Sequence, residues 1–174
     1  GNEFKYVKDC LDTGWISSAG EYVNKFEKAI QSYTGAKYAI ACMNGTAGLQ
    51  VSLILAGVTK NDIVIAPNLT FVATLNAISY ISAQTVLIDN CEDSWQIDID
   101  LLEKWLIKNT TTIIGDKPIT IEKLSGKKVG AIMPVYVLGG FVNTDKLLEI
   151  STKYGIPIIE DSTEALGSFK KGKH

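Results

Sequence analysis

The 174-residue sequence predicts an α/β fold, in which a mostly parallel sheet is covered by helices on both faces as a three-layer α/β/α sandwich. Three observations carry this prediction. Short runs rich in β-branched residues alternate with stretches of helical apolar spacing, which is the pattern of successive strand–helix units. The runs are almost continuously apolar, as strands buried on both faces are. The length and a hydrophobic content of 46% suffice for one buried core.

Strands and helices are expected in alternation along most of the chain. The predicted strands, typified by DIVIAP and TVLID, are residues 37–43, 62–67, 85–89, 129–137 and 156–160. The predicted helices, in which apolar residues recur with a period near 3.6, are residues 46–56, 71–82, 98–108 and 144–154.

Two segments lie outside this alternation. Residues 1–36 contain two predicted helices joined by a turn at 13–20, and are expected to form a separate N-terminal segment. The sheet is expected within residues 37–174. Residues 109–128 are polar and rich in turn-forming residues, which predicts a surface hairpin or loop.

Composition excludes several kinds of site. All 17 basic residues are lysines and the only histidine is His174, so the body of the chain has no arginine clamp and no histidine-based nucleophile system. Cys10, Cys42 and Cys91 are far apart, which argues against a metal site or a disulfide framework and fits a reducing compartment. A net charge of −2 gives no electrostatic footprint for nucleic acid, and no stretch resembles a membrane helix. Without a secretory signal, a soluble cytoplasmic protein is expected, and Gly1 suggests a trimmed or internal start.

Three predicted strand ends carry groups that could bind a ligand, because ligands of an open parallel sheet bind at the carboxyl ends of its strands. Asn44, Gly45 and Thr46 begin a helix whose N-terminal N–H groups suit a phosphate, with simple helix capping as the alternative. Phe71 follows the next strand and could cover a flat ring or belong to the core. Asp161 ends the last strand, where its carboxylate could face a cationic ring nitrogen, a metal or a ribose, or could cap the next turn.

The order of these groups is more specific than any one of them. A phosphate cradle, an aromatic ring and a carboxylate on successive parallel strands form a layout for holding pyridoxal phosphate. Glu160 and Asp161 are adjacent and should point to opposite faces of a strand, so they are not expected to act as a paired acid and base. Neither a P-loop nor a G-x-G-x-x-G pattern is present, which disfavours a plain nucleotide-binding domain.

The sequence resembles the DegT/StrS-type family of nucleotide-sugar aminotransferases, which are fold-type I pyridoxal phosphate enzymes. The segments NGTAGL, APNLTFVATLNAI and PIIEDSTEALGS match the family's cofactor motifs in order, and GNEFKYVKDCLDTGWISSAGEYVNKFE matches its N-terminal segment. The resemblance implies that the chain is the N-terminal portion of the large domain of such an enzyme. Residues 37–174 would then be an incomplete cofactor-binding domain.

The subgroup that aminates UDP-4-keto-6-deoxy-N-acetylhexosamines, on routes to bacillosamine and legionaminic acid, is the most similar. The polar insertion at 109–128 and the glutamate at position 164 point to it. Tyr136 and Gly140 depart from the VH-x-x-G-[HQ] pattern common in relatives, so the sequence assigns no role to that loop.

The resemblance implies a role for each matching residue. Gly45 and Thr46 would bind the cofactor phosphate, and Phe71 would stack on the pyridine ring. Asp161 would keep the ring nitrogen protonated, which lets the ring act as an electron sink. Glu164 would lie near the phenolic oxygen, where a carboxylate is unfavourable unless it is protonated or turned aside.

The turn at 13–20 resembles a segment that lines the sugar-nucleotide site. This implies substrate contacts from Trp15, Ser17, Ser18 and Gly20. A purely structural turn, with Trp15 packed against the sheet, is the alternative.

The family's Schiff-base lysine is expected beyond His174, so no catalytic residue is expected within this chain. Lys170, Lys171 and Lys173 follow the last motif too closely, and KKGK suggests a solvated turn. The complete enzyme would be a cytoplasmic homodimer that takes part in polysaccharide biosynthesis, with L-glutamate as amino donor and a UDP-linked keto-sugar as acceptor. The alternatives are a related sugar dehydratase, in which histidine replaces the lysine, and a non-catalytic binding or assembly fragment.

Overall fold

The computed structural model describes residues 1–172 and 174, which form two compact units. One unit is Gly1–Cys42 with Lys171–His174, and the other is Met43–Lys170. The units therefore part at Cys42 and Met43, a few residues after the boundary that the sequence predicts. Over the described residues, no helix combines the length and the apolar character needed to cross a membrane.

The first unit contains two helices joined by a turn, as predicted. They are α1 (Glu3–Thr13) and α2 (Glu21–Thr34). The Tyr22 hydroxyl donates a hydrogen bond of 3.0 Å to the Asp9 carboxylate, and the rings of Tyr6 and Tyr22 lie 5.2 Å apart between centroids. These contacts join the two helices to each other within the unit.

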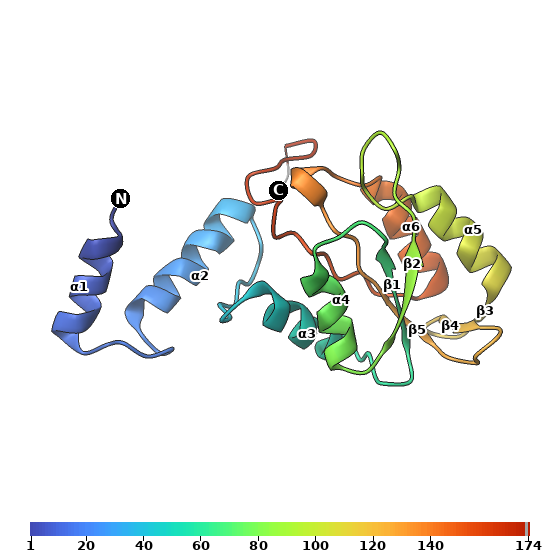
Figure 1. The fold of residues 1–174 in the computed structure, drawn as a ribbon, viewed down its shortest axis with the longest axis horizontal. Coiled ribbons are helices and arrows are strands. Elements are labelled where there is room, and N and C mark those ends of the chain that lie inside the picture. The colour runs from blue at the N-terminus through green and yellow to red at the C-terminus, as the bar shows by residue number, and fades with distance from the viewer. Residues whose placement is uncertain (173) are drawn as a thin grey trace. The chain divides into compact units, whose positions relative to one another are not determined.

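The second unit is built on three parallel strands in the order β2, β1, β5 (Figure 1). The central strand is β1 (Ile63–Pro67), flanked by β2 (Gln84–Ile88) and β5 (Val129–Ile132). Three predicted strands are thereby confirmed, although β5 is shorter than the run of apolar residues suggested. Every residue of β1 is buried, because the strand has a neighbour on each edge and a helical layer on each face.

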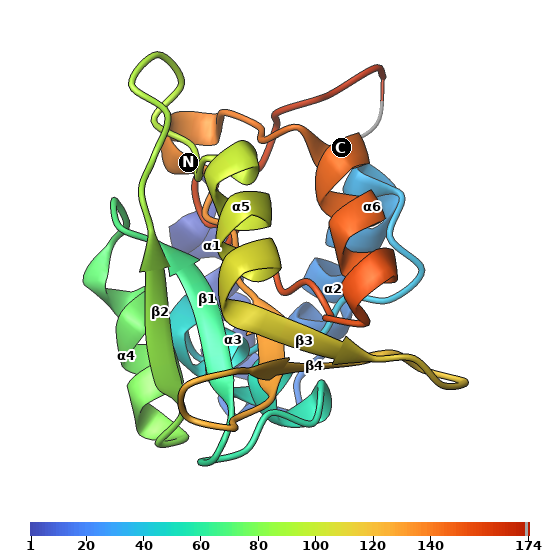
Figure 2. The ribbon, with the colours of Figure 1, turned by 90° about the vertical axis from the view of Figure 1, so that its right-hand side faces the viewer.

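Alternate residues of β1 pack into two separate apolar cores, since successive side chains of a strand point to opposite faces. Helices α5 (Ile99–Asn109) and α6 (Thr144–Tyr154) cover one face of the sheet, and α3 (Gly45–Leu55) and α4 (Val72–Tyr80) cover the other (Figure 2). Ile63 and Ile65 belong to the core beneath α5 and α6, whereas Val64 and Ala66 belong to the core beneath α3 and α4. The three-layer arrangement predicted from the sequence is confirmed. The four helices lie close to their predicted bounds.

The prediction of a strand at residues 37–43 is wrong. This segment has no strand structure, and Ile40 and Met43 are 81% and 89% exposed. A mostly apolar segment that contains Tyr38 and Ile40 favours an extended backbone, but a strand also needs the edge of a neighbouring strand for its hydrogen bonds. No strand among the described residues pairs with this segment.

The strand predicted at 156–160 is present only as an extended segment beside β5. Isolated parallel bridges join Ile132 to Ile158 and Val135 to Asp161. Proline has no N–H to donate, so Pro134 and Pro157 interrupt a continuous ladder. The segment nevertheless runs parallel to β5 and brings Asp161 to the carboxyl end of the sheet.

The polar insertion at 109–128 forms the predicted surface hairpin. Its strands are β3 (Thr110–Ile113) and β4 (Ile119–Glu122), which pair antiparallel. The Thr120 hydroxyl donates a hydrogen bond of 2.6 Å to the carbonyl of Tyr154, which ties the hairpin to the end of α6.

Candidate functional site

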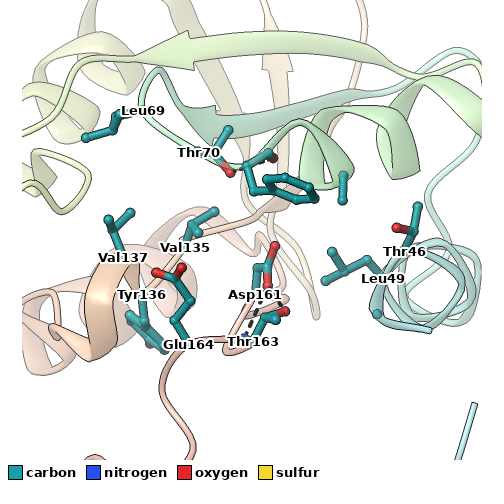
Figure 3. A pocket seen from close by; sticks show the side chains of 13 residues that line it. Thr46, Leu49, Leu69, Thr70, Val135, Tyr136, Val137, Asp161, Thr163 and Glu164 are labelled. Carbon is teal, nitrogen blue, oxygen red and sulfur yellow. Dashed lines mark hydrogen bonds between the residues drawn. The ribbon is translucent and has the colours of Figure 1, made fainter.

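A cavity of about 460 Å³ lies at the carboxyl ends of β1 and β5, where a parallel sheet is expected to bind ligands (Figure 3). Its walls come from the start of α3, the loop between β1 and α4, the segment after β5, and residues 161–164. Its volume lies within the roughly 300–1,000 Å³ of small-molecule sites. All of its walls belong to the second compact unit.

Asp161 lies in the wall of this cavity and is only 6% exposed. The Thr74 hydroxyl donates a hydrogen bond of 2.6 Å to Oδ2, and the Thr163 hydroxyl donates one of 2.7 Å to Oδ1. The backbone is fixed as well, because the Asp161 N–H donates to the Pro134 carbonyl and its own carbonyl accepts from the Tyr136 N–H. Each carboxylate oxygen therefore has a side-chain partner that sets its direction.

The N-terminus of α3 borders the same cavity. Asn44 caps the helix, and the first intrahelical hydrogen bond runs from the Gly48 N–H to the Asn44 carbonyl. The N–H groups of Gly45 and Thr46 precede that bond, so they are available to an anion. A Cβ atom on Gly45 would come within 3.6 Å of the Thr163 hydroxyl oxygen, which places the helix start beside the group that holds Asp161.

Phe71 immediately precedes α4 and lines the cavity. Its side chain is 76% exposed, so the alternative that Phe71 belongs to the core is wrong. An exposed aromatic ring in the wall of a cavity offers a flat apolar face to a ligand.

Glu164 also lines the cavity, but one of its oxygens is engaged elsewhere. Its Oε2 accepts a hydrogen bond of 2.6 Å from the backbone N–H of Leu138. Leu138 belongs to the 3₁₀ turn η1 (Val137–Gly139). One oxygen of the Glu164 carboxylate is thus turned toward this loop, and the place of Glu164 beside a phenolic oxygen stays a prediction.

Glu160 and Asp161 have separate partners, as the alternation of a strand requires. The buried Tyr136 hydroxyl donates to Glu160, while Asp161 is held by the two threonines. Burial, and in second place the hydrogen bond to Glu160, raise the pKa of Tyr136 above its usual value near 10. Tyr136 also packs on Phe141, with 5.3 Å between ring centroids. The two carboxylates do not form a paired acid and base.

The residues predicted to contact the sugar nucleotide all lie in the first unit. Trp15 is 59% exposed, and Gly20 is buried directly before α2. Ser17 accepts a hydrogen bond from the Ala19 N–H, while Ser18 lies in the same turn. The cavity is formed by the second unit alone, so a role for these residues in substrate binding stays a prediction.

No lysine lines the cavity among the described residues. Lys170 is half-buried and donates to the Val142 carbonyl at 2.9 Å and the Thr144 hydroxyl at 3.2 Å, so the solvated turn predicted at this position is wrong for Lys170. Lys173 lies outside the described residues. No group of three or more His, Cys, Asp or Glu side chains in the described chain could hold a metal ion.

The sequence did not reveal that Thr74 and Thr163 hold Asp161. Thr74 is completely buried on the inner face of a predominantly apolar helix, and a buried hydroxyl requires a hydrogen-bond partner. That requirement was a usable signal, although it did not identify the partner. Thr163 stands two residues after Asp161, at the spacing of a side-chain turn.

Sequence comparison finds relatives across the whole chain. Residues 1–174 match the model of the DegT/DnrJ/EryC1/StrS aminotransferase family. The chain is 38% identical over 173 residues to GDP-perosamine synthase of Caulobacter vibrioides, covering 99% of this chain and 42% of that protein. It is 33% identical over 173 residues to the putative pyridoxal phosphate-dependent aminotransferase EpsN of Bacillus subtilis, covering 99% of this chain and 41% of that protein. The chain thus spans about two-fifths of the length of these relatives.

Solved structures share the fold. An aminotransferase from Psychrobacter cryohalolentis superposes with a TM-score of 0.81 at 25% identity, over 98% of this chain and 39% of that one. A DegT DnrJ EryC1 StrS aminotransferase from Brucella abortus gives 0.80 at 27% identity, over 92% and 40%. The putative sugar aminotransferase Spr1654 from Streptococcus pneumoniae, in its PMP form, gives 0.79 at 27% identity, over 98% and 42%. The α/β unit described above is therefore part of the larger domain of such proteins.

Proposed function

Because this chain belongs to the DegT/DnrJ/EryC1/StrS aminotransferase family, we propose that its cavity holds pyridoxal 5′-phosphate and serves a sugar aminotransferase. The complete enzyme would transfer an amino group from L-glutamate to the C4 ketone of a nucleotide-linked 4-keto-6-deoxy sugar. The single observation that carries the proposal is the Asp161 carboxylate, buried in a cavity wall and held by a hydroxyl on each oxygen.

The cavity has suitable groups for the cofactor phosphate. The Gly45 and Thr46 N–H groups at the N-terminus of α3 provide donors, and the positive end of the helix dipole favours a dianion. Thr46 lines the cavity and would add its hydroxyl as a further donor. This arrangement binds phosphate without an arginine, which the chain lacks.

The cavity also has suitable groups for the ring. Phe71 would cover one face, and Asp161 would accept a hydrogen bond from the protonated ring nitrogen and so keep the proton there. Glu164 would border the phenolic oxygen, and its bond to Leu138 keeps one carboxylate oxygen turned aside. When bound, the cofactor supplies an electron sink for the amino-group transfer. The apolar walls at Leu49 and Val135 would exclude water around it.

The group that moves protons between donor, acceptor and cofactor is expected outside this cavity wall. No lysine lines the cavity among the described residues. We therefore propose that the lysine that forms the Schiff base with the cofactor comes from a part of the protein outside the described residues. Trp15, Ser17, Ser18 and Gly20 are proposed to contact the nucleotide sugar. The family resemblance also supports a cytoplasmic homodimer as the complete enzyme.

Two nucleotide sugars are candidates for the acceptor. The sequence resemblance favours a UDP-4-keto-6-deoxy-N-acetylhexosamine. The Caulobacter relative is named for GDP-perosamine, which makes a GDP-linked 4-keto-6-deoxyhexose the second candidate.

The test is a direct assay of the complete protein with pyridoxal phosphate and L-glutamate. Each keto-sugar is offered in turn, and the amino sugar is measured by mass together with 2-oxoglutarate. Glutamate-dependent amination of either sugar, lost in Asp161→Asn, is the expected result. Binding of the cofactor without amination of any keto-sugar would overturn the aminotransferase assignment. Light scattering on the same preparation tests the dimer.

A further inference from the structure

We infer that Thr74 is a positioning residue for Asp161, so that its hydroxyl sets the direction in which the carboxylate meets the ring nitrogen. This inference rests on the proposed function, because it assumes that Asp161 meets the cofactor ring. The structural observations that support it do not depend on that assumption. Thr74 is 0% exposed, and its hydroxyl lies 2.6 Å from Asp161 Oδ2 across 87 residues of sequence.

The direction of this hydrogen bond follows from the groups involved. A carboxylate only accepts, so the single hydroxyl proton of Thr74 is committed to Asp161. The Thr74 oxygen can then accept, and the Thr70 hydroxyl is its donor at 2.8 Å, which is nearer than the other acceptor of Thr70, the Phe71 carbonyl at 3.1 Å. Thr70, Thr74 and Asp161 therefore form an oriented chain of hydrogen bonds that ends on the carboxylate. Such chains strengthen each member in a buried setting.

The partner of Thr74 differs from the usual partner of a buried threonine inside a helix. Inside helices, threonine hydroxyls commonly donate to the carbonyl four residues earlier. The buried Thr110, at the end of α5, does so, with a hydrogen bond of 2.7 Å to the Leu106 carbonyl. Thr74 donates to Asp161 instead. Because Thr74 is in the first turn of α4, the residue four positions earlier, Thr70, precedes the helix, and the buried Thr74 hydroxyl takes the carboxylate as its partner.

The contact also joins two parts of the proposed ring site. Phe71 directly precedes α4 and Thr74 lies in the first turn of that helix, whereas Asp161 stands on the segment beside β5. The bond from Thr74 thus couples the helix that carries Phe71 to the carboxylate. The Thr74 hydroxyl thereby fixes the spacing between Phe71, which is proposed for the ring face, and Asp161, which is proposed for the ring edge.

The experiment compares Thr74→Val, which keeps the shape and loses the hydroxyl, with Thr74→Ser, which keeps the hydroxyl. In the complete protein we expect Thr74→Val to raise the dissociation constant of pyridoxal phosphate about tenfold, because a hydrogen bond to a charged group is lost. We expect kcat to fall by a similar factor while KM for the keto-sugar is unchanged. Thr74→Ser should restore both to within about threefold. Thr110→Val, which removes a buried hydroxyl bonded to the Leu106 carbonyl of its own helix, is the matched control and should change neither.

Cofactor affinity is measured by fluorescence on the apoprotein, so a result does not depend on turnover. If Thr74→Val does not fold, Thr70→Val interrupts the chain one step earlier and should weaken cofactor binding about threefold. Equal losses in Thr74→Val and Thr74→Ser, or no loss in Thr74→Val or Thr70→Val, would overturn the inference. Asp161→Asn distinguishes a failure of the role inferred for Thr74 from a failure of the proposed function. If it is impaired while Thr74→Val is normal, only the role of Thr74 is wrong, whereas a normal Asp161→Asn contradicts the proposed function itself.

Discussion

The Glu164 carboxylate accepts a hydrogen bond of 2.6 Å from the N–H of Leu138, a residue whose φ of 52° lies in the left-handed region. A left-handed conformation costs a non-glycine residue about 1–2 kcal/mol. The neighbouring Val137 carbonyl accepts a hydrogen bond of 3.0 Å from the Gln96 side chain. The turn at residues 137–139 is thus held from two sides in an unfavourable conformation, and Val137 lines the cavity.

Removing this support should loosen the turn. In Glu164→Ala, the Leu138 N–H loses its acceptor, and we expect its hydrogen exchange to accelerate about tenfold, as for the loss of a hydrogen bond to a charged group. Glu164→Gln keeps an acceptor oxygen. The logarithm of the exchange rate at the Leu138 amide should therefore rise by less than half as much in Glu164→Gln as in Glu164→Ala. Exchange measured by NMR at the Leu138 amide checks both variants. Unchanged protection in Glu164→Ala would show that the Gln96 contact alone holds the turn.

The hydroxyl of Tyr136 should make the folded protein sensitive to alkaline pH. Burial and the hydrogen bond to Glu160 raise the pKa of Tyr136 above its usual value near 10, so the folded state keeps this proton where the unfolded chain loses it. The resulting stability is complete below about pH 10 and is lost as the pH rises toward the folded pKa. At pH 11 we expect the contribution of Tyr136 to the free energy of unfolding to have fallen by about 1.4 kcal/mol.

Tyr136→Phe cannot ionise and so isolates this contribution. Urea unfolding of the protein and of Tyr136→Phe at pH 8 and pH 11 checks the prediction. The free-energy difference between them should shift by about 1.4 kcal/mol in favour of the variant at the higher pH. All other tyrosines and lysines titrate in both proteins and cancel. A difference that stays constant between the two pH values would contradict the raised pKa.

The sequence predicted the elements whose cause is local. The buried strand β1 follows from a continuous apolar run, and the start of α3 follows from Asn44 ahead of Gly45 and Thr46. Phe71 and Asp161 were both predicted at strand ends, and both line the cavity. These predictions needed only residue type, spacing and the rule that ligands lie at the carboxyl ends of parallel strands.

Features that depend on a distant partner could not be predicted in this way. The segment at 37–43 has the composition of a strand, but local composition does not state whether a neighbouring strand is present. The bond between Thr74 and Asp161 joins residues 87 positions apart, and several hydroxyls could have filled that role. The Glu164 contact likewise depends on the path of the loop at Leu138, which the sequence left without a role.

Gly155, in the second unit, should tolerate substitution poorly. It ends α6 with a φ of 64°, and a Cβ atom there would stand 2.0 Å from the carbonyl oxygen of Pro118 in the hairpin loop. Gly155→Ala should therefore destabilise the protein by at least about 2 kcal/mol, from the left-handed backbone and the clash together. Gly57→Ala is the control, because Gly57 has a φ of 80° but open space around it, and should cost only about 1 kcal/mol. The urea concentrations at the unfolding midpoints of Gly155→Ala and Gly57→Ala are compared. Equal midpoints would show that the hairpin moves away from the new Cβ atom at no cost in stability.

Thr46→Val should weaken retention of pyridoxal phosphate. Thr46 lies in the first turn of α3 and lines the cavity, so its hydroxyl is placed to donate to a phosphate, while its N–H and that of Gly45 stay available in the variant. A hydrogen bond to a charged group is worth about 1.5–3 kcal/mol, which corresponds to a rise in the dissociation constant of about tenfold or more. Thr46→Ser keeps the donor and should bind the cofactor within about threefold of the unmodified protein. Equilibrium dialysis of the three proteins measures the effect, and thermal melting of the apoproteins shows whether α3 itself is weakened. If Thr46→Val binds as tightly as Thr46→Ser at equal stability, the hydroxyl makes no contact with the phosphate, and the backbone N–H groups of the helix hold it alone.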